Sequence, residues 1–252
     1  MIYKYEKINI NYDIVGSGDP VILLHGWGTN YNTFSYLTNY LKNYFTVFLI
    51  DLPGFGKSEE PPHIYTLDNY VHFLFTFIEE LQIENPIILG HSFGGRIAIK
   101  YAAVSDNIKK LILVDSAGIK HIKSLNTYFK IVKYKYLKFY YRKTKNITKY
   151  NQLNKVSGST DYVALSDIMK GTMTKVLKEN LKPKLKKIKV ETLLIWGKDD
   201  KSTPYKDAAI MNKHISNSGI VSFDNVGHFP YLERKKQFNH IIGNFLGVVD
   251  ND

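Results

Sequence analysis

The sequence predicts an α/β fold: a mostly parallel central sheet of about eight strands with helices on both faces. Two observations carry this prediction. Short runs rich in Val, Ile and Leu alternate with helix-compatible segments, and most of the runs are bounded by Gly, Pro or Asp. Continuous apolar runs are typical of parallel strands buried on both faces, and strands alternating with helices favour a sheet covered on both sides. With 252 residues, 44% of them hydrophobic, the chain is long enough for one large core.

The individual elements follow from local patterns along the chain. Residues 2–14 alternate loosely in hydropathy before a Gly-Ser-Gly turn at 16–18, which predicts an early antiparallel strand pair. Later strands are expected within the apolar runs 21–27, 46–54, 86–92, 109–118, 191–200 and 219–228. Helices are expected between these runs at about 33–42, 67–82, 93–105, 205–214 and 233–246.

The alternation of strands and helices stops between about residues 119 and 185. This segment is rich in Lys and Tyr and has only a weak helical pattern. We interpret 119–185 as an insertion at the carboxyl edge of the sheet. The core of the fold is then expected to comprise residues 1–118 and 186–252.

The insertion also carries the positive charge of the protein. The net charge of the chain is +11, and residues 120–190 hold 19 Lys and Arg against three acids. Basic surfaces attract nucleic acids, acidic lipids or anionic substrates. No nucleic-acid-binding module accompanies this segment, so binding of nucleic acid is not expected. The readings left open are an anionic substrate or an acidic carrier protein, adhesion to anionic lipid through a basic amphipathic helix, and a merely solvated face.

Several classes of protein are disfavoured by what the sequence lacks. The chain contains no cysteine, which excludes disulfides, thiolate zinc sites and cysteine nucleophiles. The first ten residues contain no apolar signal-peptide core. No apolar run approaches the roughly 18 residues that a membrane span needs. We therefore expect a cytoplasmic protein without a transmembrane segment.

The motif GHSFGG at 90–95 places a serine between glycines where a predicted strand meets a predicted helix. In a G-x-S-x-G turn of this kind the serine hydroxyl is exposed above the sheet, and small neighbours allow the tight backbone. The following helix directs its positive end toward the site. Ser92 is therefore the candidate nucleophile, and the alternative is a glycine turn with an idle serine. The preceding His91 is expected to point elsewhere and to have a structural role.

A serine nucleophile needs a base and an acid that orients the base. His228 follows a predicted strand, at the same sheet edge as Ser92, and is the candidate base. Three aspartates that end strands are candidates for the acid: Asp200, Asp199 and Asp115. The Gly-Lys-Asp-Asp spacing, with a proline four residues after the second Asp, favours Asp200. The order Ser, Asp, His along the chain is then the one found in α/β enzymes with a serine elbow.

Two backbone N–H groups are expected to stabilise the oxyanion that forms when a serine attacks an ester carbonyl. One is the N–H of Phe93, directly after the nucleophile. The other is the N–H of Trp27 in the motif HGWG, where glycines let the backbone turn its amides inward. The substrate pocket is expected to include two residues of this loop and two aromatic residues of the insertion: His25, Gly26, Tyr128 and Phe129.

Five motifs together resemble the α/β-hydrolase superfamily, in its serine-nucleophile, lid-bearing, carboxylesterase-like branch. They are HGWG (25–28), DLPGFGKS (51–58), GHSFGG (90–95), GKDDKSTP (197–204) and VGHFPYLE (226–233). The resemblance covers nearly the whole chain. It implies that the insertion 119–185 is a helical lid after the sixth strand. It also implies a triad of Ser92, Asp200 and His228, with the N–H groups of Trp27 and Phe93 as oxyanion donors.

The activity that this resemblance implies is hydrolysis of a small to medium carboxylic ester through an acyl-enzyme, with no metal or organic cofactor. Ser92 argues against haloalkane dehalogenases and epoxide hydrolases, which use aspartate. Carbon–carbon bond hydrolysis remains an alternative. Elimination remains another alternative, because the segment Gly94-Gly95-Arg96 resembles that of a menaquinone-pathway synthase, which uses the same triad. Arg96 also fits a surface or helix-cap position. A third alternative is a low-turnover ligand-binding or signalling protein.

Overall fold

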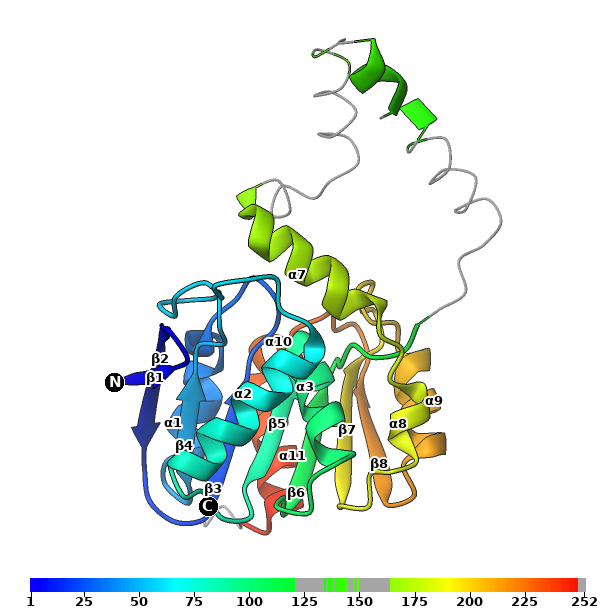
Figure 1. Ribbon diagram of the computed structural model, residues 1–252. Coiled ribbons are helices and arrows are strands. Elements are labelled where there is room, and N and C mark those ends of the chain that lie inside the picture. The colour runs from blue at the N-terminus through cyan, green and yellow to red at the C-terminus, as the bar shows by residue number, and fades with distance from the viewer. Residues whose placement is uncertain are drawn as a thin grey trace.

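The computed structural model describes residues 1–120 and 164–248 and, between them, positions 134, 136, 137, 139–144, 147 and 149. Its centre is an eight-stranded sheet with the strand order β1-β2-β4-β3-β5-β6-β7-β8 (Figure 1). The strands are β1 Ile2–Tyr5, β2 Ile8–Val15, β3 Pro20–Leu24, β4 Thr46–Ile50, β5 Ile87–His91, β6 Lys110–Val114, β7 Thr192–Gly197 and β8 Ser218–Phe223. The predicted fold class is confirmed.

The pairing of the strands follows the sequence pattern. The early antiparallel pair is present as β1 and β2, and β2 continues antiparallel onto β4. All later neighbours, from β4 through β3 to β8, pair in parallel. The last strand differs from the prediction of strands buried on both faces, because β8 forms the edge of the sheet and most of its residues are only half-buried.

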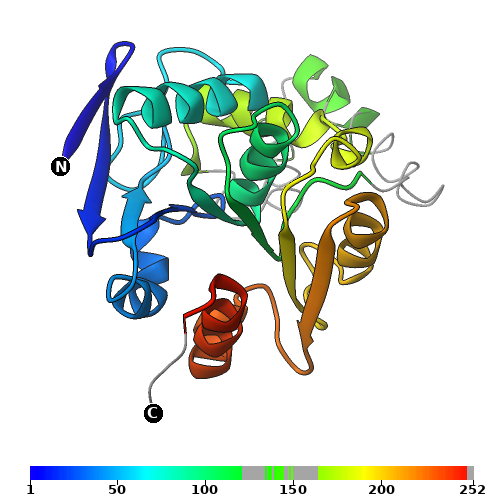
Figure 2. The same ribbon diagram turned by 90° about the horizontal axis from the view of Figure 1, so that it is seen from below.

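Helices cover both faces of the sheet, as the alternation of elements predicts. The described helices are η1 Tyr31–Phe34, α1 Ser35–Leu41, α2 Leu67–Glu80, α3 Phe93–Ala102, α7 Asp167–Lys178, α8 Lys182–Leu185, α9 Lys206–His214, α10 Pro230–Glu233 and α11 Lys235–Leu246. One apolar core lies between the sheet and α2, α3, α8 and α9, and a second lies between the sheet and α1, α10 and α11. Figure 2 shows these two layers on opposite sides of the sheet.

The carboxyl ends of the parallel strands bring the candidate residues to one edge of the sheet. Ser92 follows β5, Asp115 follows β6 and Asp200 lies shortly after β7, while His228 lies in the loop after β8. In an open α/β sheet, the ligand site forms outside this edge. Within the described ranges, no helix is long and apolar enough to cross a membrane.

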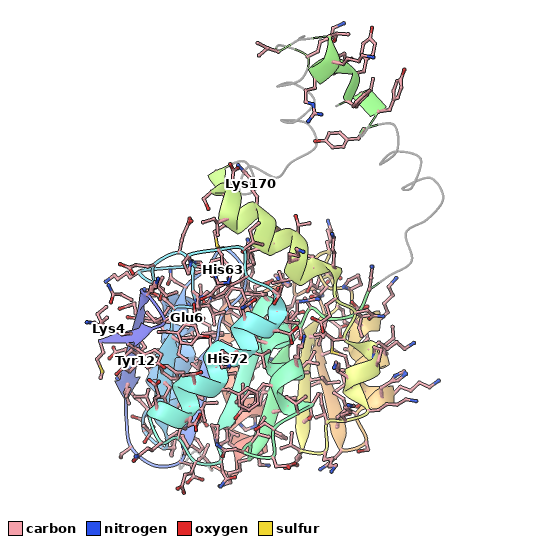
Figure 3. All side chains as sticks on the ribbon, viewed as in Figure 1. Lys4, Glu6, Tyr12, His63, His72 and Lys170 are labelled. Atoms are coloured by element: carbon pink, nitrogen blue, oxygen red, sulfur yellow. The ribbon has the colours of Figure 1, made fainter. Side chains whose placement is uncertain are left out.

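The helix α7, from the end of the predicted insertion, lies across this edge of the molecule (Figure 1). Its Met169 side chain is buried, and the Thr172 hydroxyl accepts a 2.9 Å hydrogen bond from the backbone N–H of Tyr65. Figure 3 shows Lys170 of α7 above His63, which lies in the loop that precedes α2. The loop before α2 therefore supports α7 from below.

A cation from the core holds the other end of α7. The Arg96 guanidinium on α3 donates to the carbonyl oxygens of Val176 and Glu179, at 2.6 and 2.5 Å. Cationic side chains stabilise the unpaired carbonyls at helix C-termini. Arg96 is 4% exposed, so it caps α7 from within the protein and does not lie at the surface.

The close contact between the start of α3 and β3 predicts that Gly94 cannot be replaced without loss of stability. A Cβ atom added to Gly94 would lie 2.1 Å from the carbonyl oxygen of Leu24, whereas one added to Gly219 would meet nothing within 4 Å. We expect Gly94→Ala to lower the free energy of unfolding by about 1–3 kcal/mol through overpacking. Gly219→Ala, the control, should change it by less than about 0.5 kcal/mol. Urea denaturation measures both, and equal stabilities of the two variants would contradict the packing argument.

Candidate active site

Ser92 occupies a strained turn between β5 and α3. Its backbone has φ 51° and ψ −107°, a conformation that L-residues rarely adopt. The strain is held by neighbours: the Ser92 N–H donates to the Val114 carbonyl, and the Ser92 carbonyl accepts from the N–H of Ala117, both at 3.0 Å. The surrounding structure thus fixes the turn on both sides of the serine. This is the backbone geometry expected of a nucleophile elbow.

The glycines around the serine are required by close backbone contacts. A Cβ atom on Gly90 would lie 2.6 Å from the carbonyl oxygen of Gly94, and one on Gly95 would lie 2.1 Å from the Ser116 hydroxyl. Real Cβ atoms do not approach other atoms so closely. The turn therefore needs glycine on both sides of Ser92 for steric reasons.

His91, directly before the serine, is buried beneath the loop that carries His228. The His91 Nε2–H donates to the His228 carbonyl oxygen at 2.8 Å, and the two ring centroids lie 4.7 Å apart. On its other side the His91 Nδ1 lies 3.3 Å from the Tyr231 hydroxyl. His91 thus has the structural role that the sequence predicts for it. Because it directly precedes Ser92, its hydrogen bond holds the His228 backbone close to the elbow.

His228 contacts a buried carboxylate through its Nδ1 atom. The distance from His228 Nδ1 to Asp200 Oδ2 is 2.6 Å, and the Asp200 side chain has no exposed surface. Of the three aspartates that the sequence leaves open, Asp200 alone has a carboxylate hydrogen-bonded to His228, while Asp199 is exposed. A carboxylate only accepts hydrogen bonds, so the His228 proton is on Nδ1 and Nε2 is left as the acceptor.

The carboxylate of Asp200 is held ionised by several donors. The Thr203 hydroxyl donates to Oδ2 at 2.6 Å, and the backbone N–H groups of Ser202 and Thr203 donate to Oδ1 at 2.7 and 3.1 Å. Burial alone would raise the pKa of Asp200, but the hydrogen bonds from His228 and Thr203 outweigh burial and hold the pKa below its ordinary value. Asp200 therefore supplies one negative charge behind the His228 ring.

Asp115 lies beside this pair in a different environment. It is completely buried, and its Oδ1 accepts one hydrogen bond, of 3.0 Å, from the backbone N–H of Gly197. Burial, followed by the nearby acids Asp200 and Glu233, raises the pKa of Asp115 to about 9 against the single favourable Gly197 N–H. The pKa values of the two neighbouring carboxyl groups are thus shifted in opposite directions.

Asp115, Asp200 and His228 also form the one described group with the spacing of metal ligands. One atom from each lies within 4.8 Å of the others. A metal ion here would have to displace the Thr203 hydroxyl and the backbone N–H groups that already occupy the Asp200 oxygens. The donor set therefore fits a hydrogen-bonded chain of side chains better than a cation site.

The loop after β3 passes directly beside the serine, with the Gly26 backbone close enough that an added Cβ would lie 3.5 Å from Ser92 Cβ. Three groups donate to the Gly26 carbonyl oxygen: His25 Nδ1–H at 2.8 Å, and the hydroxyl and N–H of Thr29 at 2.9 and 3.3 Å. In a trans peptide the C=O and the following N–H point in opposite directions. These bonds therefore turn the Trp27 N–H away from His25 and Thr29.

The two predicted oxyanion donors have no acceptor within the described residues. This holds for the Trp27 N–H and for the Phe93 N–H, which begins α3 and has no intrahelical partner there. Their side chains pack together, with 5.2 Å between ring centroids, and the ring of Phe55 lies 4.8 Å from that of Trp27. This aromatic group forms one wall beside the elbow.

The predicted pocket residues have different outcomes. Gly26 lies against the serine, as expected of a residue in the site. His25 differs from the prediction: it has no exposed surface, and its Nε2 accepts a 3.0 Å hydrogen bond from the Leu52 N–H. The ring therefore shapes the loop from behind and does not line a pocket. Tyr128 and Phe129 lie outside the described residues, so their role in the pocket stays a prediction.

Sequence reasoning missed the residues that support the site. Thr203 bridges the chain near the acid, since its hydroxyl lies 2.6 Å from Asp200 Oδ2 and 2.9 Å from the Asp115 carbonyl. Thr29 holds the backbone of the Gly26 loop through its hydroxyl, and the Tyr231 hydroxyl contacts the ring of His91. Thr203 lies in the motif GKDDKSTP and Tyr231 in the motif VGHFPYLE, but these motifs do not indicate what the two side chains contact.

Comparison with known proteins places these features in a family. The family profile described as alpha/beta hydrolase fold matches residues 19–146. The chain belongs to the alpha/beta hydrolase family. It is 31% identical to the AB hydrolase superfamily protein YisY of Bacillus subtilis, over 95% of this chain and 96% of that protein. The resemblance of the sequence motifs to the α/β-hydrolase superfamily is confirmed.

Two other relatives of this alpha/beta hydrolase carry esterase names. The pimeloyl-[acyl-carrier protein] methyl ester esterase of Legionella pneumophila is 26% identical over 95% of this chain and all of that protein. The solved structure of an esterase from Exiguobacterium antarcticum superposes with a TM-score of 0.74 at 25% identity, covering 96% of both chains. Together with the family profile, these relatives support a hydrolase.

The buried histidines of this hydrolase predict a loss of stability in acid. Burial lowers the pKa of His25 to about 4 from 6.5, so below pH 6.5 the unfolded chain binds a proton that the folded ring resists. Stability should therefore fall as the pH drops from about 6.5 to about 4, by up to about 3 kcal/mol from His25.

Urea denaturation at several pH values across this window tests the prediction. We expect His25→Asn to be less stable than wild type near neutral pH, where it loses the acceptor for the Leu52 N–H, but to lose less stability on acidification. Replacement of the exposed His240 by Asn is the control and should keep the wild-type slope. If wild type and His25→Asn have the same slope, His25 does not titrate as its burial implies.

Proposed function

We propose that this alpha/beta hydrolase is a serine esterase that cleaves carboxylic esters with a small to medium acyl chain. In this proposal Ser92 is the nucleophile, His228 the base and Asp200 the acid that orients the base. The observation that carries it is the 2.6 Å hydrogen bond between a buried, ionised Asp200 and His228 Nδ1, in a loop tied to the residue next to Ser92. The esterase names of two relatives support the reaction class.

The first step of the proposed reaction transfers the proton of Ser92 Oγ to His228 Nε2 while the serine oxygen attacks the ester carbonyl. The negative charge that develops on the carbonyl oxygen is stabilised by the N–H groups of Trp27 and Phe93. Asp200 stabilises the imidazolium that forms and keeps it in the reactive orientation. Because the oxyanion donors belong to the backbone, they need no rearrangement during the reaction.

The second half of the proposed reaction reverses the proton transfer. When the tetrahedral intermediate collapses, the His228 imidazolium protonates the leaving alcohol and the acyl group stays on Ser92 as an ester. A water molecule then enters, gives a proton to His228 Nε2 and attacks the acyl carbonyl. Collapse of this second intermediate releases the carboxylic acid and restores the proton of Ser92.

Turnover of p-nitrophenyl esters from acetate to palmitate tests the proposal. We expect a maximum at one chain length, because the size of the acyl pocket sets the preference. Ser92→Ala should lower kcat/KM by at least about 10⁴-fold, since it removes the nucleophile. Ser17→Ala, at an exposed turn serine, is the control and should retain the wild-type rate.

Negligible turnover at every chain length in folded protein would overturn the esterase proposal. Activity on vinylogous diketones or on a menaquinone precursor would then favour carbon–carbon hydrolysis or elimination. A stoichiometric acyl adduct on Ser92 without turnover would favour the low-turnover binding role. Undiminished ester cleavage by Ser92→Ala would place the reaction elsewhere on the protein.

For the form of the substrate, we propose an acyl group on an acidic carrier protein that is attracted by the basic insertion. A methyl ester esterase named for a carrier-bound substrate is among the relatives, and residues 120–190 concentrate Lys and Arg. On α7, Lys175 and Lys178 are exposed. Such charges raise the rate of association with an acidic partner and are screened by salt.

The prediction for this partner compares a carrier-bound methyl ester with the p-nitrophenyl ester of the same acyl group. We expect added salt and the double change Lys175→Glu, Lys178→Glu to lower kcat/KM for the carrier-bound ester by about 10-fold or more, and to spare the small ester. The double change Lys235→Glu, Lys236→Glu at two exposed positions of α11 is the charge-matched control and should affect neither. Equal effects on both substrates would remove the support for a carrier protein.

A further inference from the structure

Two carboxyl groups of this protein, those of Asp115 and Asp200, are buried side by side at the ends of β6 and β7. Both lie within 4.8 Å of a ring nitrogen of His228 and of each other. Two carboxyl groups that share a site shielded from water disfavour each other's charge, so the pKa of one of them is raised.

The hydrogen bonds show which carboxyl keeps its proton. Asp200 accepts from His228, from the Thr203 hydroxyl and from two backbone N–H groups, all of which favour its charged form. Asp115 accepts from a single backbone N–H, that of Gly197. The negative charge of the pair therefore belongs to Asp200, and the proton to Asp115.

One oxygen of Asp115 supports this assignment independently. Asp115 Oδ2 is buried and accepts no hydrogen bond from any described residue. A buried acceptor without a donor costs about 1–3 kcal/mol, and such atoms are rare in native structures. The cost disappears if Oδ2 carries the proton, because a hydroxyl there is a donor and the Asp200 carboxylate beside it is an acceptor.

We propose that Asp115 is a positioning residue of the active site: a neutral carboxylic acid whose O–H donates to the Asp200 carboxylate and holds it against His228. The proposal rests on the roles of Asp200 and His228 in the proposed function. It assigns both strand-end aspartates to the site, one as the charge and the other as its hydrogen-bond donor. A donated hydrogen bond withdraws negative charge from Asp200 and so weakens its attraction for the proton on His228 Nδ1.

The other groups that face Asp115 favour its neutral form. Glu233 on α10 is a second acid whose charge opposes ionisation of Asp115, and Tyr231 faces it from the same helix. The ring of His91 on β5, which lies beside His228, adds no positive charge nearby, because burial lowers its pKa to about 3. The charges that act on Asp115 from neighbouring elements are thus those of acids, and they agree with the hydrogen-bond pattern.

The experiment compares Asp115→Asn with Asp115→Ala. Asn keeps an N–H donor toward Asp200 and an acceptor for the Gly197 N–H, and it tolerates the φ of 40° at this position. Ala removes the donor. The readout is the rate at which a fluorophosphonate labels Ser92 as a function of pH, because this rate falls when His228 becomes protonated and needs no knowledge of the natural substrate.

We expect Asp115→Ala to move the acid limb of labelling upward by about 0.5–1 pH unit, since Asp200 then holds the His228 proton more tightly. Asp115→Asn, which keeps the donor, should show the same pH dependence of labelling as the wild-type protein. If both variants lower the limb, Asp115 is an ionised carboxylate and the proposal is wrong. If neither variant moves it, Asp115 only fills space. Asp224→Asn, at an exposed acid paired with Lys198, is the control.

Infrared spectroscopy of the wild-type protein keeps the proposal testable if a variant does not fold. At neutral pH we expect the C=O stretch of one protonated carboxylic acid, and its absence would overturn the proposal. The band should disappear in folded Asp115→Asn. Labelling of Ser92 and this band can both be observed in a protein that hydrolyses no ester, so failure of the esterase proposal is distinguishable from failure of this one.

Discussion

The turn between β5 and α3 packs so closely against β3 that a side chain at Gly94 would collide with the Leu24 carbonyl, and the rest of the site depends on this contact. The Gly94 N–H also donates to the His25 carbonyl at 3.1 Å. The elbow and the Gly26 loop are therefore fixed to each other by backbone atoms. The strained conformation of Ser92 persists because its neighbours on both sides are held in this way.

Electrostatics near the elbow follow from how many donors each buried group has. Asp200 accepts from several donors and its pKa is lowered, while Asp115 accepts from one and its pKa is raised. Burial lowers the pKa of the His25 ring to about 4 and that of the His91 ring to about 3, although the nearby acids Asp51 and Asp200 oppose these shifts. Asp200 therefore places its carboxylate directly behind His228, among buried histidine rings whose pKa values are lowered.

Helix α3 links this chemistry to α7, which lies over the sheet edge. Its first residue follows the elbow, and two cations on its first and second turns, Arg96 and Lys100, hold the end of α7. Arg96 donates to the last carbonyls of α7, while Lys100 forms ion pairs of 2.7 Å with Glu179 and with Asp68 of α2. A displacement of α7 would break these bonds, so the position of α7 and the packing of α3 depend on each other.

Local sequence patterns determined the sheet, the order of its elements and the position of Ser92 after a strand, because hydropathy period and glycine spacing reflect neighbours in the chain. They also placed His228 and three aspartates at one sheet edge. Which aspartate contacts His228, how many hydrogen-bond donors each carboxyl group has, and that His25 lies behind its loop were decided only by the tertiary structure. These properties depend on burial and on hydrogen-bond donors that residues distant in sequence supply, such as Gly197 to Asp115 and Leu52 to His25.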